Sequence, residues 1–242
     1  MKDIHSHLLY GIDDGSRSLD ESLFLLEEMS KRGVTELVLT PHYVENSDYD
    51  CNNEKKEELF DEFKHEVQKK QIPIKLYLGN EVFITPNILK LLKNKEIKTL
   101  HNSKYLLFEF PMGQIYNNTG EIINELVSNG ITPILAHPER YTVFQKHPNM
   151  VEEYLRQGLL LQGNFTSLFG KYGRVPEKTL KYFLKKHWIT FLGSDTHRSI
   201  KFDSKKLEKK LLRITKDKEY VEDLMKYNFD KVIDNEDIGM IR

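Results

Sequence analysis

Short apolar runs alternate with longer amphipathic segments along almost the whole chain. Most of these runs are continuously hydrophobic rather than alternating, which is typical of strands buried on both faces of a parallel sheet. The predicted strands span residues 3–7, 36–40, 74–78, 105–110, 131–136, 159–162 and 189–193.

Amphipathic patterns with helical spacing fill the intervals between these runs. The first, 18–32, begins with Ser18 as a cap, has Glu21 three residues later and is closed by Gly33. The other predicted helices span 54–70, 119–129, 149–157 and 177–186. Residues 203–226 form two helical stretches rich in lysine and glutamate, whose charges we expect on a solvated outer face, with a basic partner-binding strip as the alternative.

Strand followed by helix, repeated about seven times, predicts an α/β fold with a mostly parallel sheet. An open doubly wound sheet is the competing architecture, and it usually binds a nucleotide through a glycine-rich turn after the first strand. No such turn follows residues 3–7, so a closed or nearly closed barrel is favoured. The chain has no Pro/Gly/Ser-rich linker and no internal repeat, and we expect one domain over residues 1–242.

Composition excludes several classes of protein. The chain of 242 residues is 39% hydrophobic and 30% charged, with a net charge of −1, so it is not a largely disordered chain and lacks a bulk positive field for nucleic acid or anionic lipid. The single cysteine, Cys51, cannot form an internal disulfide, which indicates a reducing compartment. No apolar stretch approaches the roughly 18 residues that span a bilayer, and polar residues begin at Asp3. We therefore expect a cytoplasmic protein without membrane insertion.

Potential metal ligands follow most of the predicted strands at their carboxyl ends, where barrel enzymes gather their chemistry. The candidates are His5, His7, His42, Glu81, Glu109, His137, Asp195 and His197, with Asn164 as a weaker one. Any one of them could be an ordinary capping residue, but the recurrence at six of the seven strand ends indicates a site. The remaining histidines, His65, His101, His147 and His187, fall in helices or loops and are expected to have no ligand role.

Imidazole and carboxylate ligands without thiolate suit manganese, iron or zinc. Eight ligands exceed the needs of one ion, so the pattern predicts two or three ions, with Glu81 and Asp195 as candidate bridges. Closely spaced ions clamp a phosphoryl group and lower the pKa of a water molecule. The pattern therefore predicts a metal-dependent phosphoester hydrolase, in which a metal-activated hydroxide attacks the ester.

The residues that carry these candidates form a series of short motifs. They are Asp3-Ile4-His5-Ser6-His7, Asp13-Asp14-Gly15, Thr40-Pro41-His42, Gly79-Asn80-Glu81, Ala136-His137-Pro138-Glu139-Arg140-Tyr141 and Ser194-Asp195-Thr196-His197. In order and spacing, the series resembles the polymerase and histidinol phosphatase (PHP) superfamily over nearly the whole chain. More closely, it resembles the bacterial manganese-dependent protein tyrosine phosphatases of capsular and exopolysaccharide biosynthesis.

The resemblance implies a distorted barrel of seven β/α units with up to three metal ions. It assigns His5, His7, Glu81 and Asp195 to one ion, Glu81, Glu109 and His137 to a second, and His42 and His197 to a third, with Asp14 (or Asp13) nearby as a candidate catalytic residue. The implied metal is Mn²⁺, with iron, zinc or cobalt as alternatives. The implied substrate is the phosphotyrosine tail of an autophosphorylating bacterial tyrosine kinase that controls polysaccharide synthesis.

Arg140 matches the arginine that this family places beside its metals, where a guanidinium can grip two phosphate oxygens. Members often carry a second arginine after the Asp-x-His motif, followed by prolines. This chain has Arg198-Ser199-Ile200-Lys201 instead, so Arg198 or Lys201 is the candidate for that second phosphate contact. Tyr43, Phe83, Tyr116 and Tyr141 are candidates to flank a phenyl ring, with ordinary packing beneath loops as the alternative.

Several other functions were compared with this hypothesis. A cysteine-based phosphatase is excluded, because no arginine lies six positions after Cys51. Phosphatase activity on a small molecule such as histidinol phosphate is the main alternative. A metal-dependent exonuclease and a non-catalytic metal-binding domain fit less well, given the neutral chain and the intact ligand set. We expect phosphotyrosine to be preferred to phosphoserine, because Asp13 and Glu139 are the only spare carboxylates near the site and no clear general acid remains.

Overall fold

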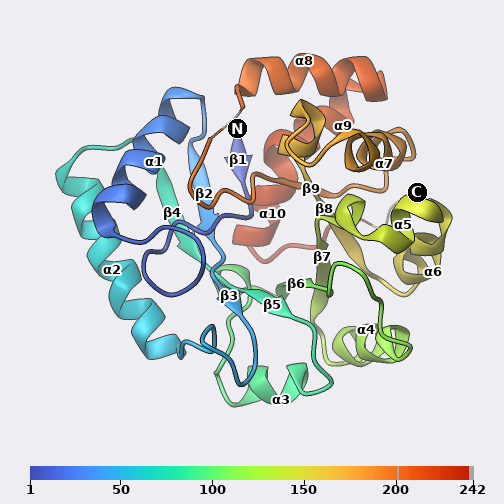
Figure 1. Cartoon of the computed structure of the whole chain (residues 1–242), viewed down its shortest axis with the longest axis horizontal. Coiled ribbons are helices and arrows are strands. Elements are labelled where there is room, and N and C mark those ends of the chain that lie inside the picture. The colour runs from blue at the N-terminus through green and yellow to red at the C-terminus, as the bar shows by residue number, and fades with distance from the viewer. Residues whose placement is uncertain (201, 240–242) are drawn as a thin grey trace.

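The computed structural model describes residues 1–200 and 202–239, and it is built on parallel strands surrounded by helices (Figure 1). The strands are β1 (Lys2–Asp3), β2 (Glu36–Leu39), β3 (His42–Tyr43), β4 (Lys75–Leu78), β5 (Glu81–Phe83), β6 (Tyr105–Glu109), β7 (Thr132–Ala136), β8 (Leu160–Asn164) and β9 (Phe191–Gly193). Each strand pairs with its neighbour in parallel. The α/β class and the parallel sheet expected from the sequence are confirmed.

Two of the strand positions are broken, which divides the strands into sheets of order β1-β2-β4 and β3-β5-β6-β7-β8-β9. The break after β2 contains Pro41, which has no N–H to donate to a ladder. The break after β4 contains Gly79 and Asn80. Beyond the breaks the same neighbours pair again, β3 with β5, so seven strand positions remain.

The first strand closes the barrel against the last one. The regular ladder of β1 is limited to Lys2 and Asp3, but the residues after it form backbone hydrogen bonds with the segment that follows β9. The Asp195 N–H donates to the His5 carbonyl at 3.0 Å and the His7 N–H to the Thr196 carbonyl at 2.9 Å. An isolated parallel bridge joins Ser6 to Thr196. The expected distorted barrel is confirmed, and its distortion lies in the strand breaks and in this irregular closure.

The barrel interior is filled by a compact apolar cluster. It contains Ile4, Val38, Tyr77, Leu100, Tyr105, Leu107, Ile134, Ala136, Leu160, Phe191, Phe229 and Val232. Phe229 and Val232 come from the last helix, α10 (Asn228–Ile233). Lys2, at the start of β1, bonds Asp230 of this helix. Tyr105, at the start of β6, donates its hydroxyl to the carbonyl of Glu236, just after the helix, at 2.6 Å. The helix therefore closes the end of the barrel where the strands begin, and leaves the opposite end to the polar residues.

The other helices cover the outside of the barrel (Figure 1). They are α1 (Leu19–Lys31), α2 (Asn53–Lys69), α3 (Ile88–Lys93), α4 (Thr119–Ser128), α5 (Thr142–Lys146), α6 (Val151–Arg156), α7 (Arg174–Lys185), α8 (Ser204–Thr215) and α9 (Lys218–Glu222), with one-turn 3-10 segments at Leu100–Asn102, Pro138–Arg140, Pro148–Met150 and Phe165–Phe169 and a π turn at Asp223–Tyr227. The Ser18 hydroxyl accepts from the Glu21 N–H, so the predicted cap of α1 is confirmed.

Four helices depart from the expectations. Helices α3, α5 and α10 were not predicted, because they are five or six residues long and too short to show a clear amphipathic period. In addition, α7 begins at Arg174 rather than 177, because Pro176 is tolerated in a first helical turn. None of the helices in the described residues is long and apolar enough to cross a membrane.

Candidate metal centre

The polar residues reach one place because side chains alternate along a strand. On β6, Tyr105 and Leu107 point into the barrel core, and Glu109 is two residues further along. On β8, Leu160 lies in the core and is followed at the same spacing by Gln162 and Asn164. The inward face of each strand is thus apolar at its start and polar at its carboxyl end.

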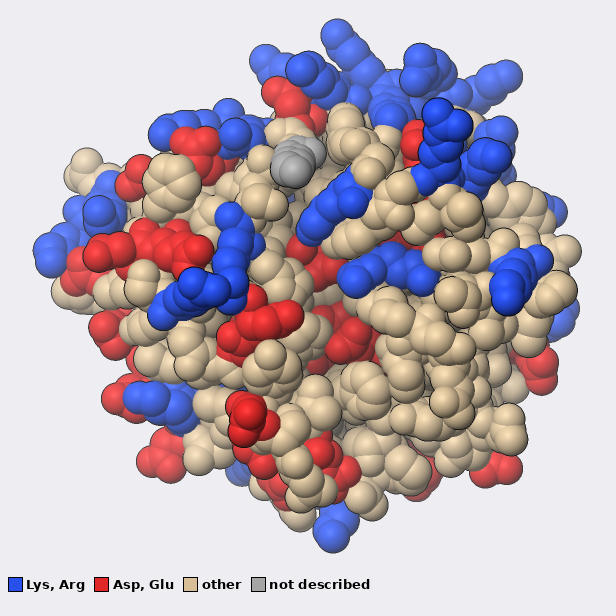
Figure 2. Space-filling model, in the orientation of Figure 1, with Lys and Arg blue, Asp and Glu red and all other residues tan. Residues whose placement is uncertain are grey.

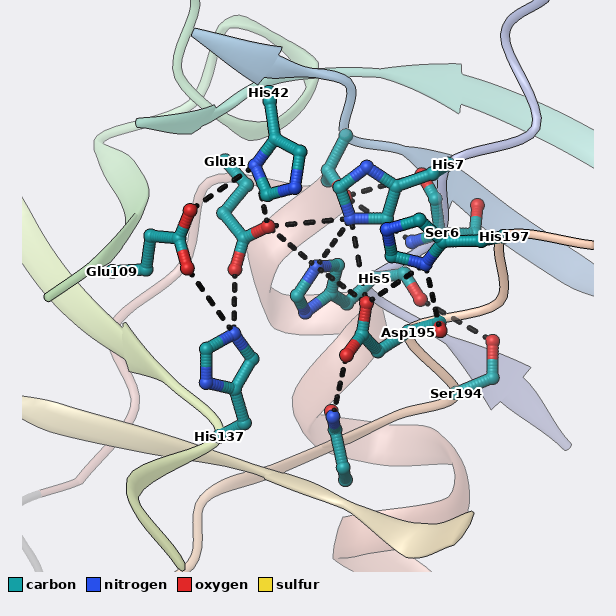
Figure 3. Close-up of polar contacts among 12 residues, drawn as sticks. His5, Ser6, His7, His42, Glu81, Glu109, His137, Ser194, Asp195 and His197 are labelled. Atoms are coloured by element: carbon teal, nitrogen blue, oxygen red, sulfur yellow. Dashed lines mark hydrogen bonds and ion pairs between the residues drawn. The ribbon is translucent and has the colours of Figure 1, made fainter. Parts of the chain in front are cut away.

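Glu81 lies at the centre of the cluster and is fully buried (Figure 3). Its Oε2 atom is 3.2 Å from the Nε2 atoms of His5 and His7. The same oxygen is 3.1 Å from His42 Nδ1, while Oε1 is 2.9 Å from His137 Nε2. Burial disfavours the carboxylate, but the nearby His5 and His42 outweigh it and hold the pKa of Glu81 well below its usual range.

Glu109 lies on the far side of His42 and His137. Its Oε1 atom is 3.2 Å from His42 Nδ1 and its Oε2 atom is 3.6 Å from His137 Nε2. Despite these short distances, His42 Nδ1 and Glu81 Oε2 are buried and make no hydrogen bond of acceptable geometry. Buried polar atoms are rarely left in this condition, and a cation between them would satisfy both. The donor set therefore fits a metal ion.

Three groups of side chains place their ligand atoms within 4.8 Å of one another. The groups are His5, His7 and Glu81; His42, Glu81 and Glu109; and His7, Asp14, His42 and His197. Because they share His7, His42 and Glu81, they form one continuous cluster. All eight predicted ligands meet at this end of the barrel, and Asp195 joins them through Oδ1, 3.5 Å from His7 Nε2 and 3.4 Å from His197 Nδ1.

Asp13 orients His7 from behind. Its Oδ2 atom is 2.7 Å from His7 Nδ1 and also accepts from the His42 N–H at 3.0 Å. A carboxylate on one imidazole nitrogen fixes the tautomer and directs the other nitrogen toward the metal. His7 holds the pKa of Asp13 below its usual range despite burial, so Asp13 is not the spare acid that the sequence suggested. Gly15 closes this turn, since a Cβ there would lie 2.0 Å from the His7 carbonyl oxygen.

Two amides of β8 hold the opposite side of the cluster. Gln162 Oε1 is 2.7 Å from His5 Nδ1, and its Nε2 donates to Asn164 Oδ1 at 2.9 Å. Asn164 Nδ2 in turn donates to Asp195 Oδ2 at 2.8 Å. Gln162 was not among the predicted site residues, although its alternation with Leu160 on a buried strand was a signal that could have identified it.

Arg140 and Tyr172 complete the surroundings of Asp195. Its Oδ2 atom accepts from Arg140 Nη1 at 2.8 Å and from the Tyr172 hydroxyl at 3.1 Å. The Arg140 guanidinium stacks on the Tyr172 ring, 4.5 Å from the centroid. With three donors on Oδ2, Asp195 keeps Oδ1 for the cluster. Both Asp195 and His137 have left-handed backbones, with φ of 49° and 36°, a strain typical of functional strand ends.

A cavity of about 370 Å³ opens above the cluster. Its lining consists of Asp14, Arg140, Lys171, Tyr172, Asp195, His197, Arg198 and Ser199. Asp14 Oδ1 is 3.3 Å from His197 Nε2, and this contact lowers the pKa of Asp14 to about 2. Arg198 lines the cavity, but its guanidinium donates to the carbonyls of Gly15 at 2.9 Å and Asp14 at 3.0 Å. Lys201, the other candidate for the second phosphate contact, lies outside the described residues.

The structure corrects the expectation for Tyr141. It is 1% exposed, and its hydroxyl accepts from the Phe110 N–H at 3.0 Å, so the ring supports His137 and does not face a substrate. Tyr43 is buried as well, and neither Phe83 nor Tyr116 lines the cavity.

Two other aromatic side chains lie at the rim and were not predicted. Tyr49 stacks on His42, with ring centroids 6.0 Å apart, and Tyr172 lines the cavity. Both belong to loops, where sequence spacing carries no signal about direction.

Glu139, the second spare carboxylate, is engaged in hydrogen bonds away from the cavity. It is fully buried, and its Oε1 atom accepts from the Ser167 hydroxyl at 2.7 Å and the Asn164 N–H at 3.1 Å. Burial raises its pKa to about 7. It anchors the loop after β8 and is absent from the cavity lining, so it is not placed as a general acid.

A buried lysine braces the two strand breaks that precede His42 and Glu81. Lys56 of α2 donates to Asn80 Oδ1 at 2.7 Å, and Asn80 Nδ2 donates to the Pro41 carbonyl at 2.9 Å. His42 and Glu81 are register partners immediately after these residues. Burial lowers the pKa of Lys56 to about 7. This role was not predicted, because Lys56 lies on a helix among many charged residues.

Comparison with known proteins agrees with this geometry. The family model described as capsular polysaccharide synthesis, CpsB/CapC, matches residues 1–234. The chain is 35% identical to CapC of Staphylococcus aureus over 99% of this chain and 93% of that protein. It is 33% identical to the tyrosine-protein phosphatase CpsB of Streptococcus agalactiae over 81% of this chain and 83% of that protein.

The fold is shared as well. A chain from the solved structures of YwqE from Bacillus subtilis and CpsB from Streptococcus pneumoniae, described as metal-dependent tyrosine phosphatases, superposes with a TM-score of 0.89 at 24% identity, over 99% of this chain and 96% of that one. The motifs, the barrel and the matched length agree with one another, and the chain belongs to the CpsB/CapC family of capsular polysaccharide synthesis.

Proposed function

We propose that this protein is a metal-dependent protein-tyrosine phosphatase, with residues 1–242 as a single catalytic domain. The observation that carries the proposal is the buried Glu81 carboxylate among four imidazoles, with Glu81 Oε2 and His42 Nδ1 lacking hydrogen-bond partners. The similarity to proteins named as tyrosine phosphatases supports the same activity.

The proposed ligands follow the clusters at the barrel end. His5, His7, Glu81 and Asp195 would hold one ion, and Glu81, Glu109 and His137 a second. His42 and His197, with Asp14 beside them, would hold a third. The proximity of His42 to both Glu81 and Glu109 also allows it to serve the second ion. When bound, such ions supply Lewis acidity toward phosphoryl oxygens and a nucleophile near neutral pH.

Arg140 is the proposed phosphate-binding residue. It lines the cavity, it is held by Asp195 and the Tyr172 ring, and its side chain is 24% exposed. A guanidinium with one nitrogen engaged still offers donors for phosphate oxygens. Positive charge at this point offsets charge that develops on the phosphoryl group during transfer.

The carboxylates that line the cavity are Asp14, whose contact with His197 lowers its pKa to about 2, and Asp195, whose Oδ2 atom accepts three hydrogen bonds. Neither holds a proton to donate near neutral pH, which supports a substrate with a good leaving group. The tyrosine phenol has a pKa near 10, so it departs as a phenolate without prior protonation. A serine alkoxide is far more basic and needs an acid or a metal on the leaving oxygen. Asp13 is bound to His7 and Glu139 is buried, so neither donates a proton there. These arrangements favour phosphotyrosine over phosphoserine.

The proposed substrate is the phosphotyrosine tail of a bacterial tyrosine kinase that regulates capsular or exopolysaccharide synthesis, and the proposed metal is Mn²⁺. Membership in a capsule-synthesis family supports the first. The histidine-rich donor set supports a transition metal over a hard ion such as Mg²⁺. Nucleic acid is not proposed as a substrate, because the net charge of −1 supplies no general attraction.

The deciding experiment measures kcat/KM on a phosphotyrosine peptide, a phosphoserine peptide of the same sequence and histidinol phosphate. Metal-stripped protein is assayed after adding back Mn²⁺, Zn²⁺, Co²⁺ or Mg²⁺. We expect the phosphotyrosine peptide to be preferred, with Mn²⁺ restoring more activity than Mg²⁺. A preference for histidinol phosphate would favour a small-molecule phosphatase, and equal rates on both peptides would reveal an acid that the structure does not place at the cavity.

The ligand assignment is tested by His137→Ala and His5→Ala. Each removes an imidazole at the barrel end rather than a packing residue, so we expect turnover to fall more than about 100-fold, or ~2.7 kcal/mol of barrier. Circular dichroism should remain native while bound metal decreases. His147→Ala, at an exposed site, is the matched control. Activity within tenfold of wild type in either variant would remove that histidine from the ligand set.

A further inference from the structure

One face of helix α8 carries a concentration of positive charge. The whole chain is nearly neutral, with 36 Lys and Arg against 37 Asp and Glu. The helix Ser204–Thr215 contains Lys205, Lys206, Lys209, Lys210 and Arg213, and Glu208 is its single acidic residue. Figure 2 shows Lys and Arg gathered along the top edge of the molecule, over α8.

This arrangement opposes helix stability. Lys206 lies three and four residues from Lys209 and Lys210, and both of these lie a similar distance from Arg213. Like charges at such spacings repel one another on a helix. Among the described residues, Lys210 is the only α8 cation in an ion pair, 3.8 Å from Glu177. The remaining charge is therefore left for an external anion or for solvent.

An exposed aromatic ring lies among these cations. Phe169 ends the 3-10 segment after β8 and is 36% exposed. Lys210 Nζ is 5.1 Å from its ring centroid. A hollow of about 420 Å³ is lined by Phe169, Lys206, Lys209, Lys210 and Arg213. Cations around an apolar ring suit an acidic peptide with apolar or aromatic side chains, because both kinds of side chain find a partner there.

A single short loop joins this hollow to the metal centre. Phe169 is three residues from Tyr172, whose hydroxyl donates to Asp195. Lys171, between them, donates to the Asp195 carbonyl at 3.1 Å. Three residues of chain span at most about 11 Å. A substrate segment a few residues long can therefore reach from the cavity to the α8 face.

We propose that the α8 basic face, formed by Lys206, Lys209, Lys210, Arg213 and Phe169, is a docking surface for an acidic segment of the substrate protein next to its phosphotyrosine. This inference rests on the proposed phosphatase function and adds a recognition element to it. A peptide is favoured over a lipid surface because the loop that carries Phe169 also carries Lys171 and Tyr172 of the cavity. Charge complementarity on this face accelerates encounter and lowers KM, while the chemical step is unchanged.

The test compares two triple variants with equal charge change. Lys206→Glu/Lys209→Glu/Arg213→Glu reverses the α8 face. Lys90→Glu/Lys93→Glu/Lys95→Glu, at and beside helix α3, is the matched control, because these residues are exposed and α3 lies at the opposite edge of the molecule (Figure 1). Substrates are a phosphotyrosine peptide with acidic residues at three to eight positions from the phosphotyrosine, the same peptide with those residues changed to glutamine, and p-nitrophenyl phosphate.

We expect wild type and the α3 variant to prefer the acidic peptide, mainly through a lower KM that rises with salt. In the α8 variant, the ratio of kcat/KM for the acidic peptide to kcat/KM for the glutamine peptide should fall about tenfold or more. The glutamine peptide and p-nitrophenyl phosphate should be hydrolysed at the wild-type rate. Those two substrates report the proposed phosphatase function alone, so its failure is seen separately. Equal preference in the α8 variant and wild type would overturn the docking surface. Binding of wild type to phosphatidylglycerol vesicles that the α8 variant loses, without acidic-peptide preference, would overturn it in favour of a membrane surface.

Discussion

Glu81 is surrounded by His5, His7, His42 and His137, and each imidazole contacts one of its two carboxylate oxygens. Without bound ions, the imidazoles must supply the positive charge that balances it. Burial disfavours protonated imidazoles, but the neighbouring carboxylates outweigh it. Glu81 raises the pKa of His5 to about 9, and Asp13 raises the pKa of His7 to about 10. Metal ions would replace those protons, so metal loading is expected to release protons.

Arg140→Ala should lower kcat/KM for a phosphotyrosine peptide by roughly 100-fold or more, about 2.7 kcal/mol, while leaving bound metal unchanged. The reason is that Arg140 lines the cavity and supplies phosphate donors, whereas Asp195 keeps Asn164 and Tyr172 as hydrogen-bond partners. Steady-state kinetics and metal analysis are the measurements. Arg156→Ala, at an exposed arginine, is the control. Unchanged kinetics would assign Arg140 a structural role only.

Lys56→Met should change how stability depends on pH. The pKa of Lys56 is about 7 in the fold and near 10.5 in the unfolded chain, so between these values the unfolded chain binds more protons. Stability from this group therefore rises with pH in that window, by up to about 1.4 kcal/mol per pH unit. In urea unfolding at pH 7, 8 and 9, the free energy of unfolding of wild type should increase relative to that of Lys56→Met as the pH rises. Lys55→Met, at an exposed lysine, should show no such trend; a constant gap for Lys56→Met would contradict the prediction.

The strand breaks give β3 and β5 their place in the site. Each break shifts a short second segment, His42–Tyr43 or Glu81–Phe83, into the six-stranded sheet while the preceding segment stays in the three-stranded one. Asn80, in the second break, donates to the carbonyl of Pro41 in the first, and Lys56 of α2 donates to Asn80. His42 and Glu81, two of the three residues shared between the groups of candidate ligands, are thus placed by the same local feature.

Helix α10 supports the barrel from the opposite end. Phe229 is 4% exposed within the inner cluster, so Phe229→Ala should reduce the free energy of unfolding by about 3–5 kcal/mol. Tyr227→Ala, in the preceding turn and 44% exposed, should cost less than about 0.5 kcal/mol. Urea denaturation compares the two. Because the metal centre lies at the other end, metal bound per folded molecule should stay constant; loss of metal in folded Phe229→Ala would show that the two ends are coupled.

Metal binding should stabilise the whole molecule, because the cluster joins side chains from the first, middle and last strands. An ion that binds only the folded state raises stability by RT ln(1 + [L]/Kd). Differential scanning fluorimetry of chelator-treated protein should show a larger rise in Tm with Mn²⁺ than with the same concentration of Mg²⁺. Equal shifts would argue against an imidazole-based site. His137→Ala should show a smaller Mn²⁺ shift than wild type.

Much of the fold followed from local pattern. Buried parallel strands require continuous apolar runs, and the amphipathic helices between them require a period near 3.6, so both leave a signal within about ten residues. The fold class and the barrel were therefore predicted and are confirmed. The family was predicted instead from the resemblance of the short motifs that carry the candidate ligands, and it is confirmed as well. The convergence of His5, His42, Glu109, His137 and the other candidates followed from the rule that parallel strands end at one edge. Their roles as metal ligands stay predictions.

What sequence could not supply depended on contacts between distant segments. The bonds of Gln162 to His5, Tyr172 to Asp195 and Lys56 to Asn80 join residues 23 to 157 positions apart. The burial of Tyr141 and Glu139 and the closure of the barrel by α10 are likewise set by packing partners far along the chain. A residue's type and local spacing specify which strand end it occupies, because backbone periodicity is local. Which atoms it meets there depends on the three-dimensional arrangement of all seven strand positions, and no local pattern encodes that.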